Sequence, residues 1–284
     1  MVMCYNECMT MRRGFTLIEV SLFLAVTALL FVGITAGTQN SINQQRKSDA
    51  INGFADFLRN VYSEVSNPQS NGKGTSDQAI YGRLITFGES KALDGENNEN
   101  KRSIFVYDVL GDVSGDFGSG SSLQNMLKEL DVTVFYEKKV NNGVNAMLSL
   151  VGQTESYSPR WQSEIENTTR NSGPISAAIL IVRHPRSGTI NTLVLEGSTL
   201  EINNAARDLA SGTPITINSP AYTGTHGILK GKIDEFQVKE INFCVDTFGE
   251  NNNERRNVRI VANARNSSGV QVIDQDTDDN KCVE

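Results

Sequence analysis

The residue of this chain best suited to chemistry is Glu19, a lone carboxylate inside an otherwise apolar stretch. The stretch runs from Phe15 to Gly37, which is 23 residues, and holds no other charged side chain. A carboxylate within a membrane-spanning helix costs about 2.5 to 3.5 kcal/mol on insertion scales. A buried charge of this kind is tolerated when it is paired, so we expect Glu19 to meet a cation.

The apolar stretch has the length and composition of a membrane span. At about 1.5 Å per residue, a helix over it reaches roughly 35 Å, enough to cross a hydrocarbon core. Arg12 and Arg13 precede the stretch, whereas the next basic residues are Arg46 and Lys47. Positive charges favour the cytoplasmic side, so we expect a cytoplasmic N-terminus and export of the remaining chain.

Three other interpretations of this segment stay open. It could be a secretory signal cleaved near Thr35-Ala36-Gly37, although such signals have shorter apolar regions without an acid. It could also be a plain signal anchor with Glu19 near the lipid headgroups. In the third, Glu19 is an acid whose side chain reaches to the membrane surface.

Residues 14–20, Gly-Phe-Thr-Leu-Ile-Glu-Val, resemble the cleavage and methylation motif of type IV prepilins and type II secretion pseudopilins. The resemblance covers about the first fifth of the chain. It implies that a membrane aspartyl peptidase cuts after Gly14 and methylates the new terminal amine on Phe15. It also implies that Thr16 and Glu19 act in assembly, with the Glu19 carboxylate meeting the terminal ammonium of a neighbouring subunit. Buried ion pairs across subunits fix register more than they add stability.

The same resemblance implies a function and a set of partners. The chain is expected to be a structural subunit of a type IV pilus or related filament, a minor or tip subunit because of its size. Its partners are then the prepilin peptidase and methyltransferase, other pilin subunits and a membrane assembly platform. It resides in the cytoplasmic (inner) membrane as a single-pass protein, with its head outside, before it joins an extracellular filament serving adhesion, secretion or uptake. The alternative is a monomeric, single-pass, membrane-anchored extracellular binding protein.

One feature departs from the family pattern. Many of these helices carry a proline about two-thirds along the span, whereas this chain has Gly33 and Gly37 there. Two glycines four residues apart permit a flexible point or close helix packing.

The four cysteines fall into two groups. Cys4 and Cys8 lie in the expected leader, whereas Cys244 and Cys282 lie in the exported part, where oxidation is allowed. Pilins commonly close their C-terminal region with a disulfide, so the resemblance favours a Cys244–Cys282 bond over two free thiols. Closing that loop stabilises the fold by roughly 4 kcal/mol in the chain-entropy model.

The predicted organisation is a cleaved leader (1–14), a transmembrane helix (15–37), an amphipathic continuation of the helix (38–66) and a β-rich head (67–284). The continuation follows from apolar residues spaced three and four apart, and it ends before Asn67-Pro68. Two shorter helices separated near Gly37 are the alternative. An insertion is expected in residues 152–230, because the head is larger than a minimal pilin head.

Alternating and β-branched runs predict an antiparallel sheet, so the fold class is α+β, with a long N-terminal membrane-spanning helix packed on an antiparallel head. Asn141-Asn142-Gly143 predicts a hairpin. Short helices are expected at 121–130 and 203–209. The predicted strands are 79–87, 103–110, 132–140, 145–151, 177–183, 189–195, 232–245, 257–264 and 269–273.

Catalytic patterns are poorly supported, so the chain is not expected to be an enzyme. The only histidines are His184 and His226, and no G-x-S-x-G motif occurs. No cofactor is expected, except that Asp274, Asp276 and Asp278 suggest a calcium site, the alternative being a solvated acidic loop.

Two further clusters of side chains have the chemistry to bind a ligand. Arg255, Arg256, Arg259 and Arg265 collect near the C-terminus, yet the chain without residues 1–14 has 24 basic and 32 acidic residues. Nucleic acid is therefore an unlikely partner. Trp161, beside Tyr157 and Arg160, either touches a ligand or anchors a loop as a partly buried side chain, and the second is the commoner role.

Overall fold

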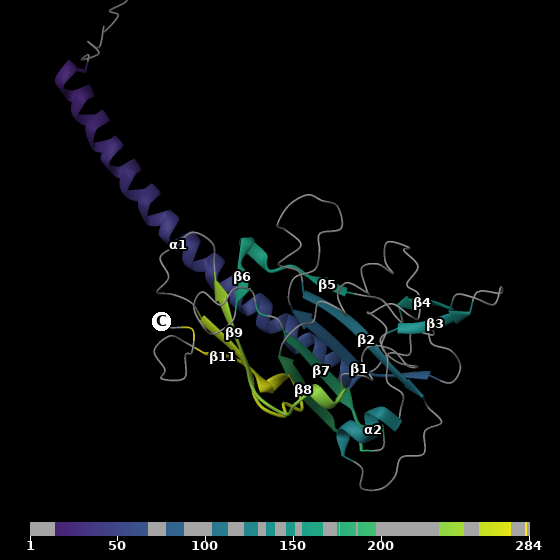
Figure 1. Cartoon of the computed structure of the whole chain (residues 1–284). Helices are drawn as coiled ribbons and strands as arrows, with labels where there is room; N and C mark the ends of the chain where they lie inside the picture. The colour runs from purple at the N-terminus through teal and green to yellow at the C-terminus, as the bar shows by residue number, and fades with distance from the viewer. Residues whose placement is uncertain are drawn as a thin grey trace, which may run out of the picture. The chain divides into compact units, whose positions relative to one another are not determined.

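The computed structural model describes residues 15–67, 78–87, 104–112, 122–129, 135–139, 146–150, 155–166, 175, 177–185, 187–196, 233–246, 256–273 and 282. These residues form one long helix, short helical segments and antiparallel β-sheets (Figure 1). The predicted α+β class is thereby confirmed. The chain divides into two compact units, Met1–Lys47 and Ser48–Glu284.

Helix α1 runs without interruption from Leu17 to Ser66, 50 residues. One continuous helix was predicted, and the alternative of two helices broken near Gly37 is wrong. The helix ends just before Pro68, because a residue preceding proline disfavours the helical conformation. Its last carbonyl, Ser66 O, accepts a hydrogen bond from Arg183 Nη1 at 3.2 Å. A cation there also complements the partial negative charge of the helix C-terminus.

The first part of α1 is apolar on all sides. Between Phe15 and Ile34 its large apolar side chains are 46 to 89% exposed. In the part of the chain that the structure describes, α1 is the one helix long and apolar enough to cross a membrane. A helix with this all-round pattern is stable in lipid or among other helices rather than in water.

The larger sheet has the strand order β5–β2–β1–β7–β8, with every neighbouring pair antiparallel. Most of its strands coincide with predicted ones, but β5 was missed because three residues carry too little periodicity. The strands are β1 (Gln78–Phe87), β2 (Ile104–Asp112), β5 (Glu155–Tyr157), β7 (Ala177–Arg183) and β8 (Ile190–Glu196).

The second sheet has the order β11–β10–β9–β6, and β3 and β4 form a separate hairpin. Strand β6 was missed, and the strand predicted over 232–245 is shorter, because residues 233–235 form a 3₁₀ turn, η3. The strands are β3 (Phe135–Lys139), β4 (Ala146–Leu150), β6 (Glu164–Glu166), β9 (Ile241–Asp246), β10 (Arg256–Ile260) and β11 (Val270–Ile273). The hairpin predicted around 141–143 is confirmed by the β3–β4 pairing.

The remaining predictions concern two short helices and the range 152–230. The helix predicted at 121–130 is α2 (Leu123–Glu129), whereas the one at 203–209 lies outside the described residues. Strands β5 to β8 all fall within 152–230, and they join both main sheets. The described part of that range is therefore integral to the head rather than a separate unit.

The core of the head forms between α1 and the two sheets (Figure 1). Five α1 residues recur at spacings of three and four and are buried: Ile51, Phe54, Leu58, Val61 and Val65. The Phe54 ring lies edge-on to Phe87 of the larger sheet, at 6.3 Å between centroids, and to Phe243 of the second sheet, at 5.4 Å. One helical face thus joins both sheets.

Gly82 is required where β1 approaches β7. The β1–β2 register shifts between Ile80 and Gly82. A Cβ atom at Gly82 would lie 2.1 Å from the carbonyl oxygen of Ile181, a backbone atom that has little freedom to move. Only glycine fits this close contact.

A buried hydrogen-bond chain connects α1, β8 and the loop after β10. The Thr192 hydroxyl donates to Ala264 O at 2.7 Å, and the Tyr62 and Thr192 hydroxyls lie 2.7 Å apart. Since the single Thr192 proton is committed to a carbonyl, Tyr62 must donate to Thr192. Burial raises the pKa of Tyr62 to about 12, although the Thr192 bond lowers it in part.

A charged cluster also fixes the end of α1 to β1 and β2. Arg83 forms an ion pair with the buried carboxylate of Asp108 and another with Glu64 of α1 at 3.3 Å. Burial raises the pKa of Glu64, although Arg83 lowers it in part. Removing Arg83 would leave the buried Asp108 carboxylate without its cation, which is costly.

We expect the stability of the head to fall between about pH 10 and pH 12 through Tyr62. The Tyr62 hydroxyl ionises near pH 10 in the unfolded chain and near pH 12 in the folded one. The contribution of neutral Tyr62 to the free energy of unfolding is therefore complete below pH 10 and is lost progressively as the pH rises to 12. The loss from this group is roughly 3 kcal/mol. Chemical denaturation across this range measures it. A Tyr62→Phe variant is expected to be about 1 kcal/mol less stable at neutral pH and less sensitive to alkali. Parallel pH curves for the two proteins would contradict the assignment.

Candidate functional site

The predicted functional residues at the start of α1 form a helix N-cap. The Glu19 amide donates to Thr16 Oγ1 at 3.3 Å and to Thr16 O at 3.0 Å. Thr16 is thus the capping residue, and Glu19 is the third residue of the first turn. This Thr-x-x-Glu spacing is that of a capping box. Phe15, immediately before the cap, is 79% exposed, and Glu19 is exposed as well.

The hydroxyl groups in the apolar part of α1 are satisfied by the helix itself. Ser21, Thr27, Thr35 and Thr38 each donate to a carbonyl three or four residues earlier, at 2.8 to 2.9 Å. Such bonds lower the free-energy cost of placing a hydroxyl group in a low-dielectric environment. The Glu19 carboxylate can accept from backbone N–H groups at the helix start, as in a capping box, but such bonds leave its negative charge in place.

Gly33 and Gly37 leave open space on the helix surface. A Cβ at either position would have no atom within 4 Å. Neither glycine is therefore required by packing within the described chain. Their spacing of four places both on one side of the helix, where a second helix can approach closely.

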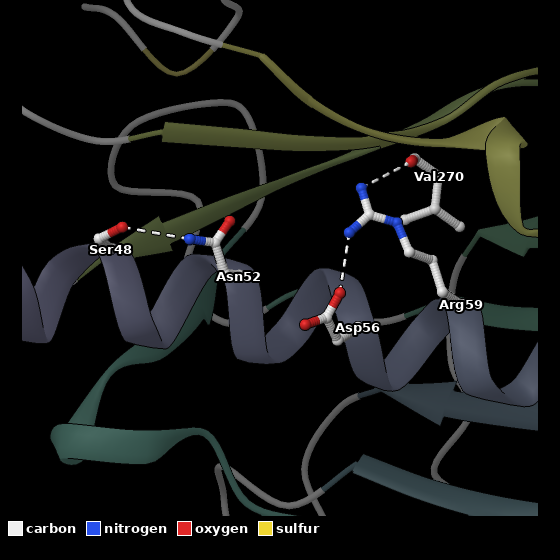
Figure 2. Close-up of polar contacts among 5 residues, drawn as sticks. All are labelled: Ser48, Asn52, Asp56, Arg59 and Val270. Atoms are coloured by element: carbon white, nitrogen blue, oxygen red, sulfur yellow. Dashed lines mark hydrogen bonds and ion pairs between the residues drawn. The ribbon is translucent and has the colours of Figure 1, made fainter.

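Beyond Lys47, the side of α1 away from its buried residues carries polar side chains. Figure 2 shows the hydrogen bonds that Asn52 and Arg59 make there. Asn52 Nδ2 donates to Ser48 Oγ at 3.1 Å. Arg59 donates to Asp56 at 2.9 Å and to Val270 O, at the start of β11, at 3.3 Å. The exposed Arg59–Asp56 pair contributes little stability by itself. The bond from Arg59 to Val270 O instead holds α1 against the second sheet.

A second functional candidate is the turn around Trp161, which the sequence left undecided. The structure shows Trp161 52% exposed, hence partly buried, which is compatible with either role. Its backbone has φ 59° and ψ 35°, the left-handed region, which costs a non-glycine residue roughly 1 to 3 kcal/mol. The conformation is held by Ser163, whose amide and hydroxyl both donate to Arg160 O at 3.1 and 2.7 Å.

The Trp161 turn lies over one flank of α1. The Tyr157 ring stacks on Phe57 with 4.3 Å between centroids. A Cβ at Gly53 would lie 3.7 Å from Tyr157 Oη and 3.9 Å from Arg160 Cδ. Burial raises the pKa of Tyr157, with a partly opposing effect of Arg160. The turn therefore borders the helix directly.

The disulfide predicted for the C-terminal region is present. Cys244 of β9 is bonded to Cys282, and both residues are buried. The bond holds Cys282 to the second sheet.

Several other predicted site residues fall outside the part of the chain that the structure describes. Gly14 and the three aspartates proposed for calcium, Asp274, Asp276 and Asp278, lie outside the described residues. Within the described ranges, no group of three His, Cys, Asp or Glu side chains could hold a metal ion. Of the arginine cluster, Arg259 donates to Gln271 Oε1 at 2.8 Å across β10 and β11.

Sequence reasoning missed two features of the site. The capping role of Thr16 could have been found, because Thr-x-x-Glu before an apolar run is a recognisable helix start. The left-handed Trp161 could not, since no local pattern predicts that conformation for a bulky residue.

Loss of the Thr16 cap should loosen the first turn of α1. We expect Thr16→Val to increase the hydrogen-exchange rate of the Glu19 amide by about fivefold in detergent micelles, equivalent to about 1 kcal/mol. Thr16→Ser keeps the hydroxyl and should exchange like wild type. If the Glu19 amide exchanged equally fast in Thr16→Val and wild type, the Thr16 hydroxyl would not cap the helix.

Compared with protein-family models, curated proteins and solved structures, the chain matches none of them. Three features of the chain itself bear on its function: the capped helix start with an exposed carboxylate, the apolar surface behind it, and the head built around the second half of the same helix.

Proposed function

We propose that this chain is a pilin-like filament subunit, cleaved after Gly14 and assembled by packing of its apolar helix with those of neighbouring subunits. The observation that carries the proposal is Glu19, one exposed anion in the first turn of α1 and the only charged residue of the 23-residue stretch from Phe15 to Gly37. Its partner is the terminal ammonium of Phe15 on an adjacent subunit.

The position of the cap supports a partner from another chain. After cleavage, the Phe15 ammonium stands one residue before the Thr16 cap, at the positive end of the helix dipole. Its own helix end therefore repels it, while a carboxylate in low dielectric attracts it strongly. The exposed Glu19 of a neighbour supplies that charge, and the pairing fixes the register of two helices.

The remaining features fit storage in a membrane followed by assembly. The exposed apolar side chains of residues 15–34 hold the subunit in the cytoplasmic membrane, with the head outside, until the assembly platform transfers it. The head then supplies subunit contacts and an outer surface. Its size favours a minor or tip subunit, because large loops hinder close helical packing. No covalent catalysis is required of this chain.

Intact-mass analysis of the protein purified from its own membranes tests processing. The proposal requires loss of residues 1–14 and one added methyl group on Phe15. A monomeric membrane-anchored binding protein, the competing function, keeps its first residues or loses a different segment. A full-length chain in isolated membranes or fibres would refute the proposal.

We expect Glu19→Ala to be inserted and cleaved but to assemble poorly. Removing the carboxylate should favour membrane insertion, since the cost of about 2.5 to 3.5 kcal/mol disappears. Fibres sheared from cells should then contain at least about tenfold less of the variant, because the intersubunit pair is lost. Glu19→Gln, which keeps the shape without the charge, is the matched control and should behave like Glu19→Ala. Normal incorporation of either variant would argue against the pairing.

A further inference from the structure

The loop between β10 and β11 carries a short motif that the proposed function does not use. Residues 266–268, Asn-Ser-Ser, have the form Asn-x-Ser without a proline in the middle, the acceptor motif for N-linked sugars in exported proteins. The chain holds one other motif of this kind, at residues 167–169, which lies outside the described residues. Only the motif at Asn266 can therefore be judged by its geometry.

The loop is anchored on its inner side and exposed at the motif. Ala264 and Gly269 are buried, and a Cβ at Gly269 would lie 2.4 Å from Ala264 Cβ, so the inner side has no room for a larger residue. The Val261 amide donates to Gly269 O at 3.0 Å and closes the loop. By contrast, residues 266–268 are all exposed. A group attached to Asn266 can therefore extend into solvent.

The Asn266 side chain already contacts the hydroxyl group that the motif requires. Its Oδ1 accepts from the Ser268 amide at 3.1 Å and from Ser268 Oγ at 2.6 Å. The first bond caps the 3₁₀ turn over residues 267–269, and an aspartate would cap it as well. The second bond is not needed for the cap. A hydroxyl that donates to Oδ1 draws electron density away from the amide nitrogen, so Nδ2 releases a proton more readily.

We propose that Asn266 is an acceptor for an N-linked sugar, and that the Ser268 hydroxyl polarises its amide for the transfer. The donor belongs to the class of sugars carried on a lipid pyrophosphate outside the cytoplasm, and the partner is a transferase that reads the Asn-x-Ser motif. The inference rests on one part of the proposed function, the export of the head. It requires neither cleavage after Gly14 nor assembly into a filament.

The transfer changes one bond on each reactant. Asn266 Nδ2 attacks the anomeric carbon of the sugar, so a carbon–nitrogen bond forms while the bond from that carbon to the phosphate oxygen breaks. The lipid pyrophosphate leaves with the bonding electron pair, and the proton lost from Nδ2 passes to a base of the transferase. Nothing is oxidised or reduced. Because Oδ1 takes no part in the new bond, it can keep its two hydrogen bonds to Ser268 after the transfer.

Three variants separate a sugar acceptor from a residue that only caps the turn. Asn266→Asp keeps a side-chain oxygen for the cap but has no amide nitrogen to modify. Ser268→Ala keeps the backbone amide that the cap uses and removes only the hydroxyl. Ser268→Thr keeps the hydroxyl and is the matched control. If Asn266 only caps the turn, the mass of each variant differs from that of wild type by the substitution alone.

The measurement is peptide mass spectrometry of the full chain, expressed in its own cells and purified from their membranes. We expect the wild-type peptide that contains Asn266 to carry an added mass of whole sugar units. The sugar should be absent from Asn266→Asp. It should be at least about fivefold less abundant in Ser268→Ala, which loses one hydrogen bond, and within about twofold of wild type in Ser268→Thr.

The outcomes distinguish this inference from the proposed function. An unmodified Asn266 in the wild-type protein overturns the inference, even if Asn167 carries a sugar. Equal modification of Ser268→Ala and wild type overturns the role of the hydroxyl. Both results leave the proposed function intact, because cleavage after Gly14 is measured separately on the same preparation. A sugar on Asn266 in a chain that keeps residues 1–14 supports the acceptor site and refutes the filament subunit.

Discussion

Helix α1 must be stable in two different environments along one continuous backbone, and the rest of the molecule is arranged around that requirement. From Ile51 to Val65 its apolar residues keep to one side, which the two sheets cover. From Phe15 to Ile34 they surround the helix and are exposed. The first pattern is satisfied within the chain, whereas the second needs lipid or other helices.

The energies of the apolar part show why one carboxylate is tolerated there. Twelve Leu, Ile, Phe and Val residues lie between Leu17 and Ile34. At about 0.3 to 0.6 kcal/mol each, they favour insertion by roughly 4 to 7 kcal/mol. Glu19 opposes this by about 2.5 to 3.5 kcal/mol at most, since it lies near one end of the stretch. Insertion therefore stays favourable, but by a margin small enough for a paired charge and helix packing to compete with lipid.

Much of the fold could be predicted because its signals are local. The spacing of Ile51, Phe54 and Leu58 predicts the buried face of α1, and Asn141-Asn142-Gly143 predicts the β3–β4 hairpin. Strands β5 and β6 were missed since each has three residues, and a pairing partner rather than a sequence pattern defines them. The order of strands in the sheets depends on contacts between residues far apart in the chain, which periodicity does not contain.

The candidate site divides in the same way. Glu19 is conspicuous in the sequence because it breaks an apolar run, and Thr16 has the spacing of a cap. The two cysteines could be paired by compartment and family resemblance. Trp161 was undecided, since exposure and backbone conformation both depend on how Tyr157 and Ser163 are fixed by distant parts of the fold. A strained residue is stable only because its surroundings determine its conformation.

The head cannot move independently of the second half of α1, because that half is the centre of its core. Tyr62 is hydrogen-bonded to Thr192, Arg83 pairs with Glu64, and Arg183 caps the last turn. Moving the helix out would break all three contacts and expose its buried face. A bend in α1 is therefore easiest before Ser48, where Gly33 and Gly37 each weaken the helix by about 1 kcal/mol relative to alanine. The two glycines thus give this part of the helix a weak point rather than a fixed kink.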